Sequence, residues 1–87
     1  MRAADPTVQT RRAAFGNAVR ARRRALGWSQ FELAERAGCD PQSIHRVEAA
    51  RNSPSLDRVF LLADALGCPA WVLLVDGHAE AQKETQT

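Results

Sequence analysis

Tyrosine is absent from this 87-residue chain, and the chain has no run of β-branched residues. Its apolar residues are mainly alanine, leucine and valine, a composition that favours helices over strands. A chain of this length suits one domain, which buries about 60% of its unfolded surface. The sequence therefore predicts a single all-α domain.

Long hydrophobic stretches are also missing. No apolar run approaches the roughly 18 residues that a membrane-spanning helix requires. The N-terminal stretch MRAADPTVQTRRAAF is charged and polar and lacks the apolar core of a secretory signal. We therefore expect a cytoplasmic protein that has no membrane partner.

Cysteine is scarce, and its spacing excludes the usual metal sites. Cys39 and Cys68 belong to no C-x-x-C motif and to no Cys/His cluster. We expect two reduced thiols that pack as small apolar residues, with a redox pair as the alternative. His45 and His78 lie far apart and no phosphate-binding loop is present, so we expect neither an enzyme nor a cofactor.

Charge is distributed unevenly along the chain. Residues 1–51 contain ten arginines and five acidic residues, a net charge of +5. Residues 52–87 contain two basic and five acidic residues, a net charge of −3. The strongly basic N-terminal half, residues 1–51, indicates a polyanionic partner.

Helix start and end signals predict five helices in a compact bundle. Ser29 and Glu32 form an S-x-x-E capping box, and Asp40 followed by Pro41 is typical of a helix start. The expected helices cover residues 12–26, 29–38, 40–49, 55–67 and 69–75. The folded domain then spans residues 12–77, between a flexible arm (1–11) and a polar tail (78–87). Helical spacing places these side chains on the core side of the first and fourth helices: Phe15, Val19 and Leu26, and Leu56, Val59, Leu62, Ala63 and Leu66.

The second and third expected helices are joined by a tight turn, Ala37-Gly38-Cys39-Asp40, which predicts a helix-turn-helix over residues 29–49. At 100° per residue, the third helix directs Ile44, Val47 and Glu48 to the core and has Gln42, His45, Arg46 and Ala49 on the opposite side. Glutamine and arginine are well suited to bidentate contacts with adenine and guanine. The alternative is an ordinary solvated polar face.

Glu48 is unusual because it lies on the core side of its helix. A buried carboxylate without a partner costs several kcal/mol. Arg22 or Arg23 on the first helix could supply that partner.

Three stretches, RARRRALGWSQFELAERAG, DPQSIHRVEAARNSPSL and LLADALGCPAWVLL, resemble the Xre/Cro-type helix-turn-helix family of bacterial and phage repressors. The resemblance covers about two-thirds of the chain, from residue 15 to residue 75. It implies a lambda-repressor-like domain that binds double-stranded DNA. It also selects Arg23 over Arg22 as the partner of Glu48.

The resemblance implies roles for further residues. Gln42 and Arg46 match base-reading positions, Ser43 matches a position that contacts phosphate or base, and Gln30 and Arg51 match phosphate contacts. We also expect Ser29 and Arg20 on the phosphate side, and Pro41 and His45 on the base-reading side.

Some positions depart from the family pattern. Ala50 stands where the family has glycine, so we expect the turn to shift and Asn52 to take the left-handed conformation. Pro41 can offer only apolar contact, and the role of His45 stays open. Phe31, at a position that is usually polar, either packs against DNA sugars or shields the helix cap.

Four apolar residues are left over after the core is assigned, and we expect them to form a homodimer interface: Leu61, Trp71, Val72 and Val75. Our leading hypothesis is a dimeric transcriptional regulator, a repressor or autoregulator, that binds a pseudo-palindromic operator. The alternative is the antitoxin of a toxin–antitoxin pair, which would bind a protein partner as well as its own operator.

Overall fold

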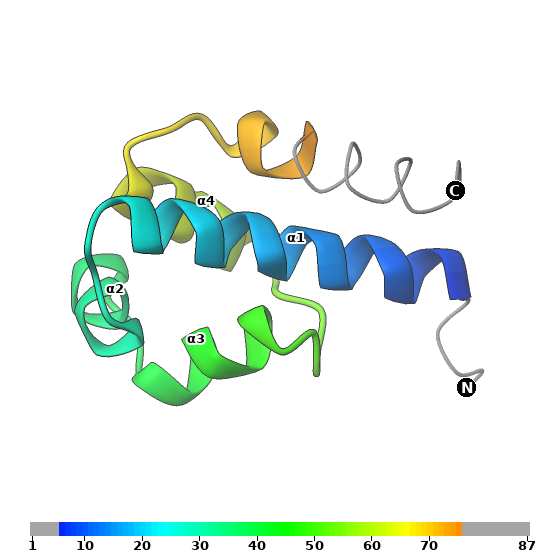
Figure 1. Ribbon diagram of the computed structural model, residues 1–87, viewed down its shortest axis with the longest axis horizontal. Helices are drawn as coiled ribbons and strands as arrows, with labels where there is room; N and C mark the ends of the chain where they lie inside the picture. Colours follow the sequence, from blue (N-terminus) through cyan, green and yellow to red (C-terminus); the bar gives the residue numbers. More distant parts are fainter. Residues whose placement is uncertain (1–5, 76–87) are drawn as a thin grey trace.

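Helices account for most of the chain that the computed structural model describes, residues 6–75. Four carry labels in Figure 1: α1 (Pro6–Ala25), α2 (Gln30–Ala37), α3 (Pro41–Glu48) and α4 (Leu56–Leu66). A fifth helical segment covers residues 70–75 and lies along α1 on the side away from α3 (Figure 1). The expected all-α class is confirmed, with no strand among the described residues.

The helix starts lie where the capping residues predicted them. The Ser29 hydroxyl accepts a hydrogen bond from the Glu32 backbone, and the Glu32 side chain accepts one from the Ser29 backbone, which completes the capping box of α2. Asp40 caps α3 by accepting from the Ser43 amide at 2.8 Å, and Ser55 caps α4 by accepting from the Arg58 amide at 3.1 Å.

The first helix is longer than the sequence predicted. It begins at Pro6 rather than Arg12, so the expectation of a flexible arm is wrong for residues 6–11. Proline suits the first position of a helix because its missing N–H would be unpaired there in any case. Thr10 donates to the Pro6 carbonyl at 2.9 Å and Arg12 donates to Gln9 at 3.0 Å, so polar contacts within the helix stabilise this turn. Residues 1–5 and the expected tail, 78–87, lie outside the described residues.

Every helical segment contributes one large, fully buried side chain to a common core. These residues are Val19 of α1, Leu33 of α2, Ile44 of α3, Leu62 of α4 and Leu73 of the last segment. Two side chains expected in this core are exposed instead, Leu26 at 48% and Leu56 at 64%. Leu26 follows the last residue of α1 and Leu56 is the first residue of α4. Helical projection assigns a face to a residue, but it does not say whether a terminal turn reaches the core.

Gly16 allows α1 and α3 to approach each other closely. A β-carbon at this position would stand 2.5 Å from the Val47 carbonyl oxygen and 3.0 Å from that of Glu48. Because both neighbours are backbone atoms, a side chain here would push the end of α3 away from α1. Gly16 therefore sets how deeply α3 sits against the rest of the domain.

The end of α3 uses an alanine in a conformation that favours glycine. Gly27, Gly38 and Gly67 follow α1, α2 and α4 with φ between 71° and 75°, and Ala50 follows α3 with φ of 57°. The Arg51 amide then donates to the Arg46 carbonyl at 2.9 Å, which is the hydrogen bond of a Schellman motif. The expectation that Asn52 would take the left-handed position is wrong, because this hydrogen bond fixes the left-handed residue at Ala50, one position after the cap residue Ala49.

Ala50→Gly should stabilise the protein. An L-residue in the left-handed region costs roughly 1–2 kcal/mol, and glycine avoids most of this cost while losing some chain entropy. We expect the free energy of unfolding to rise by about 0.5–1 kcal/mol, measured by urea denaturation. Ala49→Gly is the matched control, since Ala49 has φ of −85° and ψ of 0°. Glycine at residue 49 should give no gain, and equal effects of the two variants would contradict the argument.

Candidate nucleic-acid interface

Two short helices, α2 and α3, meet through a three-residue turn. Gly38 ends α2 in the left-handed conformation, and the Cys39 amide donates to the Ala34 carbonyl at 2.9 Å. Asp40 then caps α3, and Pro41 occupies its first turn. This arrangement defines a helix-turn-helix, in which α3 has the position of the recognition helix.

The two sides of α3 differ sharply. Ile44, Val47 and Glu48 are at most 3% exposed and face the core. Gln42, His45 and Arg46 are exposed on the other side, and their side chains form no hydrogen bond within residues 6–75. Three polar side chains with unused donors and acceptors are thus presented together by a helix that is packed on its other face.

The Glu48 carboxylate is the centre of a buried cluster that joins three helices. Arg23 of α1 donates to both oxygens, from Nε to Oε2 at 2.7 Å and from Nη2 to Oε1 at 2.9 Å. Gln30 of α2 and Arg20 of α1 donate to Oε1 at 3.0 Å and 3.3 Å. Arg23 also donates to the Trp28 carbonyl at 2.7 Å, which attaches the connection between α1 and α2 to the cluster. Glu48 therefore has Arg23 as its partner, and α3 is held in a fixed orientation on α1 and α2.

Hydrogen bonding outweighs burial in setting the charge of this cluster. Burial raises the pKa of the Glu48 carboxyl, because it disfavours the charged form. The hydrogen bonds from Arg23 and Gln30 and the charge of Arg23 lower that pKa by more, so it lies below its ordinary value. The pKa of Arg23 is raised, chiefly by its hydrogen bond to Glu48. Both groups are therefore charged at neutral pH.

Four of the expected contact residues lie around one open cavity of about 240 Å³, between the start of α2 and the exposed side of α3: Gln30, Pro41, Gln42 and His45. Arg46, which follows His45 in α3, and Arg51, which follows the end of that helix, are both exposed. Ser43 lines a separate polar cavity of about 120 Å³ with Asn52, Ser55 and Arg58. The structure thus brings the α2 and α3 residues to one region.

Three expected phosphate contacts also have structural partners. The Ser29 hydroxyl is engaged in the capping box, and Arg20 and Gln30 donate to Glu48. Sequence analysis did not predict that Arg20 or Gln30 contacts Glu48, although Arg20 and Arg23 are three residues apart and so share a face of α1. Arg58 was missed as well, and its Nη1 is buried without a partner among the described residues.

The contacts around α2 were also not predicted from the sequence. The guanidinium of Arg36, in the last turn of α2, lies 4.2 Å from the centre of the Trp28 ring, a cation–π contact between α2 and the connection that precedes it. Phe31 is 58% exposed and does not pack into the core. Its side chain is therefore available at the surface of α2.

Comparison with known proteins agrees with this geometry. The sequence pattern of the helix-turn-helix family matches residues 19–70. An uncharacterized HTH-type transcriptional regulator of Methanothermobacter thermautotrophicus is 47% identical over 49 residues, which cover 56% of this chain and 71% of that protein. The Neisseria hypothetical transcription factor of Neisseria meningitidis is 37% identical over 70 residues, which cover 80% of this chain and 66% of that protein.

Solved structures show the same fold. The clp gene regulator ClgR of Corynebacterium glutamicum has a TM-score of 0.82 at 25% identity, with 87% of this chain and 81% of that chain covered. The crystal structure of the Neisseria factor has a TM-score of 0.76 at 33% identity, with 94% of each chain covered. The chain therefore belongs to the helix-turn-helix family, whose members are DNA-binding transcriptional regulators and not enzymes.

Neither a membrane segment nor a metal centre is found in the described part of the chain. No helix within residues 6–75 has the length and hydrophobicity needed to cross a bilayer. The same residues contain no group of three His, Cys, Asp or Glu side chains that could hold a metal ion. Cys39 and Cys68 are free and half-buried.

Glu48→Ala should destabilise the fold by roughly 3–5 kcal/mol, because it leaves the buried Arg23 guanidinium without its counter-ion. Urea denaturation measures the loss. Glu35→Ala, on the exposed side of α2, is the matched control and should stay within about 0.5 kcal/mol of wild type. A stability close to wild type for Glu48→Ala would show that the cluster does not hold α3.

The lowered pKa of Glu48 predicts that the stability of the fold falls at acidic pH. Because the native pKa of Glu48 is lowered, its contribution is complete above the ordinary value of about 4.5 and is lost as the pH falls through the native pKa. Glu48→Gln should therefore show a shallower loss of stability below about pH 4. A smaller loss should remain through Asp40, whose pKa is lowered by the hydrogen bond from the Ser43 amide. Equal acid curves for wild type and Glu48→Gln would contradict this prediction.

Proposed function

We propose that this chain is a transcriptional regulator that binds a pseudo-palindromic operator as a homodimer and acts as a repressor or autoregulator. One observation carries the proposal: α3 is locked on its buried side by the Glu48 cluster and presents Gln42, His45 and Arg46 on its free side. A helix that reads base edges must have a fixed orientation, because its contacts depend on hydrogen-bond geometry.

Base reading is assigned to the exposed side of α3. Arg46 can form a bidentate contact with guanine and Gln42 with adenine. Pro41 and His45 border the same cavity as Gln42 and would contact neighbouring bases. Pro41 can offer only apolar contact, for example with a thymine methyl group.

Phosphate contacts are assigned to residues that come before and after α3 in the chain. Arg51 is exposed just after the helix, and Gln30 and Ser29 lie at the start of α2, where the helix dipole favours an anion. Arg20 keeps a side chain that is 36% exposed while it bonds to Glu48. Ser43 and Arg58 line the polar cavity beside the α3–α4 connection and add a hydroxyl and a guanidinium there.

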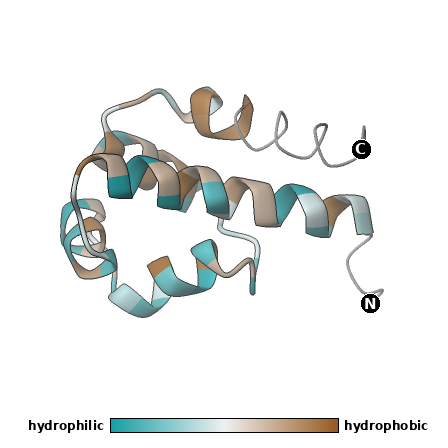
Figure 2. Ribbon diagram, viewed as in Figure 1, coloured by the Kyte–Doolittle hydropathy of each residue, from teal (hydrophilic) through white to brown (hydrophobic). Residues whose placement is uncertain are grey.

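The dimer is assigned to an apolar surface on α4 and residues 70–75. Leu61, Trp71 and Val75 are 45%, 64% and 54% exposed, and Val72 is half-buried. Figure 2 shows this last helical segment as strongly hydrophobic, in contrast to the largely polar α3. Large exposed apolar side chains gathered on adjacent segments are typical of a protein interface. A two-fold dimer would place its two α3 helices about 34 Å apart, one turn of DNA.

Arg46→Ala and Gln42→Ala should each weaken binding to the specific site by about 1–3 kcal/mol and relax the preference at one or two base pairs. The specific site is first obtained by selecting bound fragments from random double-stranded DNA. Arg51→Ala is the control, because loss of a phosphate contact weakens all sequences alike and reduces the log–log salt slope by about 1. Equal weakening of Arg46→Ala on specific and random DNA would remove its base-reading role.

Leu61→Glu and Val72→Glu should leave the monomer folded and abolish cooperative binding to the two half-sites, since each places a charge in the apolar interface. Sedimentation reports the oligomeric state, and titrations with full and half operators report cooperativity. Leu26→Glu is the matched control, because Leu26 is similarly exposed but lies at the end of α1. If the Leu61 and Val72 variants still sediment as dimers on the full operator, the interface lies elsewhere.

A further inference from the structure

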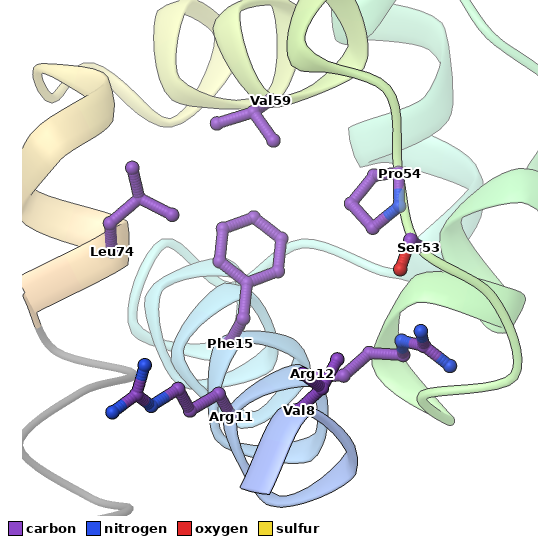
Figure 3. Close-up of a pocket in the computed structure, with 8 residues that line it drawn as sticks. All are labelled: Val8, Arg11, Arg12, Phe15, Ser53, Pro54, Val59 and Leu74. Carbon is purple, nitrogen blue, oxygen red and sulfur yellow. The ribbon is translucent and has the colours of Figure 1, made fainter. Parts of the chain in front are cut away.

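A second concave site lies away from the exposed side of α3. It is a groove of about 250 Å³ whose floor and walls are apolar and come from three parts of the chain. Figure 3 shows Phe15 of α1 between Leu74, Val59 and Pro54. None of the exposed α3 residues lines it, so the groove is separate from the base-reading contacts assigned above.

The groove is bordered by positive charge. Arg11 and Arg12 extend on either side of Phe15 (Figure 3), and none of the residues that line the groove is acidic. Arg11 has no hydrogen bond or ion pair within residues 6–75. The Nε of Arg12 is buried and has no acceptor among the described residues, although its Nη1 donates to Gln9. An incoming carboxylate would give the exposed Arg11 a charged partner that the described residues do not supply.

The size of the groove decides between a small molecule and a protein segment. Pockets that enclose metabolites usually measure about 300–1,000 Å³ and bury most of the ligand. At about 250 Å³, this open groove lies just below that range, so it suits an apolar side chain of a protein segment better than an enclosed metabolite. Protein interfaces are commonly anchored by single bulky side chains that fill such sites, with charged groups around them.

We propose that this groove binds an acidic segment of another protein, which inserts a bulky apolar side chain over Phe15 and places its carboxylates on Arg11 and Arg12. The partner binds without covering α3, so the regulator can hold DNA and the partner at the same time. Ser53 and Pro54 line both the groove and the polar cavity beside Ser43, so the partner contacts the connection that follows α3. This inference does not depend on the proposed operator or dimer.

The probe is a phage-displayed library of 12-residue peptides, selected on the wild-type chain in the absence of DNA. We expect the enriched peptides to share a large apolar residue flanked by aspartate or glutamate. A synthetic copy of the best peptide should bind at least tenfold more weakly to Val8→Glu and to Arg11→Glu. Both changes add a negative charge at the groove, and Val8 is 47% exposed, so neither removes a core contact.

The matched controls lie at the other end of α1. Leu26→Glu and Arg24→Glu alter the net charge by the same amounts on exposed residues, and they should bind the peptide like wild type. Circular dichroism melts establish that each variant is folded. Val8→Glu and Leu26→Glu should bind double-stranded DNA with equal affinity, a measurement that tests DNA binding separately from the groove.

Three results would overturn the proposal. Failure to enrich any common motif would show that the groove is not a docking site, and a basic or uncharged motif would show that the arginines do not select the partner. Dissociation of a dimer by Val8→Glu, measured by sedimentation, would identify a second copy of this chain as the occupant. Equal loss of peptide binding in the Leu26 and Arg24 variants would show that general charge, and not the groove, governs binding.

Discussion

The Glu48 carboxylate holds together the parts of the domain that meet DNA in a helix-turn-helix protein. Its two oxygens accept hydrogen bonds from Arg23, Gln30 and Arg20, which belong to two other helices. A single ion pair would leave α3 free to rotate about the bond. Donors from several directions remove that freedom, and the full set of hydrogen bonds is what makes a buried charge tolerable. The orientation of α3 follows from this cluster more than from its own eight residues, which are too few for a stable isolated helix.

Two backbone features act with the cluster at the end of the same helix. Gly16 lets α1 approach the last carbonyl groups of α3, and Ala50 turns the chain away just after the cap residue Ala49. Arg20 donates from Nη2 to the Glu48 carbonyl at 3.3 Å, so the C-terminal end of α3 is also capped by a positive charge. The strained alanine is kept in place by the hydrogen bonds that the Ala50 and Arg51 amides donate to the Val47 and Arg46 carbonyls.

The sequence predicted features that are encoded by near neighbours. The caps at Ser29, Asp40 and Ser55 depend on residues three positions away, and the structure has all three. The need of Glu48 for a partner followed from its place on the core side of α3, and helical spacing was enough for that inference. The family match over residues 19–70 likewise agrees with the resemblance seen in the sequence.

Features that depend on distant parts of the chain were not predictable in this way. No local pattern shows that Gly16 faces the carbonyl groups of α3, or that Leu26 and Leu56 lie beyond the reach of the core. The start of α1 was missed because residues 6–11 lack apolar periodicity, although helix continuity and local hydrogen bonds suffice there. Gln30 and Arg20 joined the Glu48 cluster because three helices converge on one carboxylate, and such convergence appears only in the folded chain.

The contrast between the two sides of α3 bears on how such a regulator can evolve. Gly16, Arg23 and Glu48 are each tied to other parts of the fold, so mutations at these positions will be removed by selection for stability. Gln42, His45 and Arg46 form no side-chain hydrogen bond within the described residues, so the fold tolerates other side chains there. Duplicated genes of this kind can therefore diverge to new target sequences through a few exposed positions while the scaffold stays unchanged.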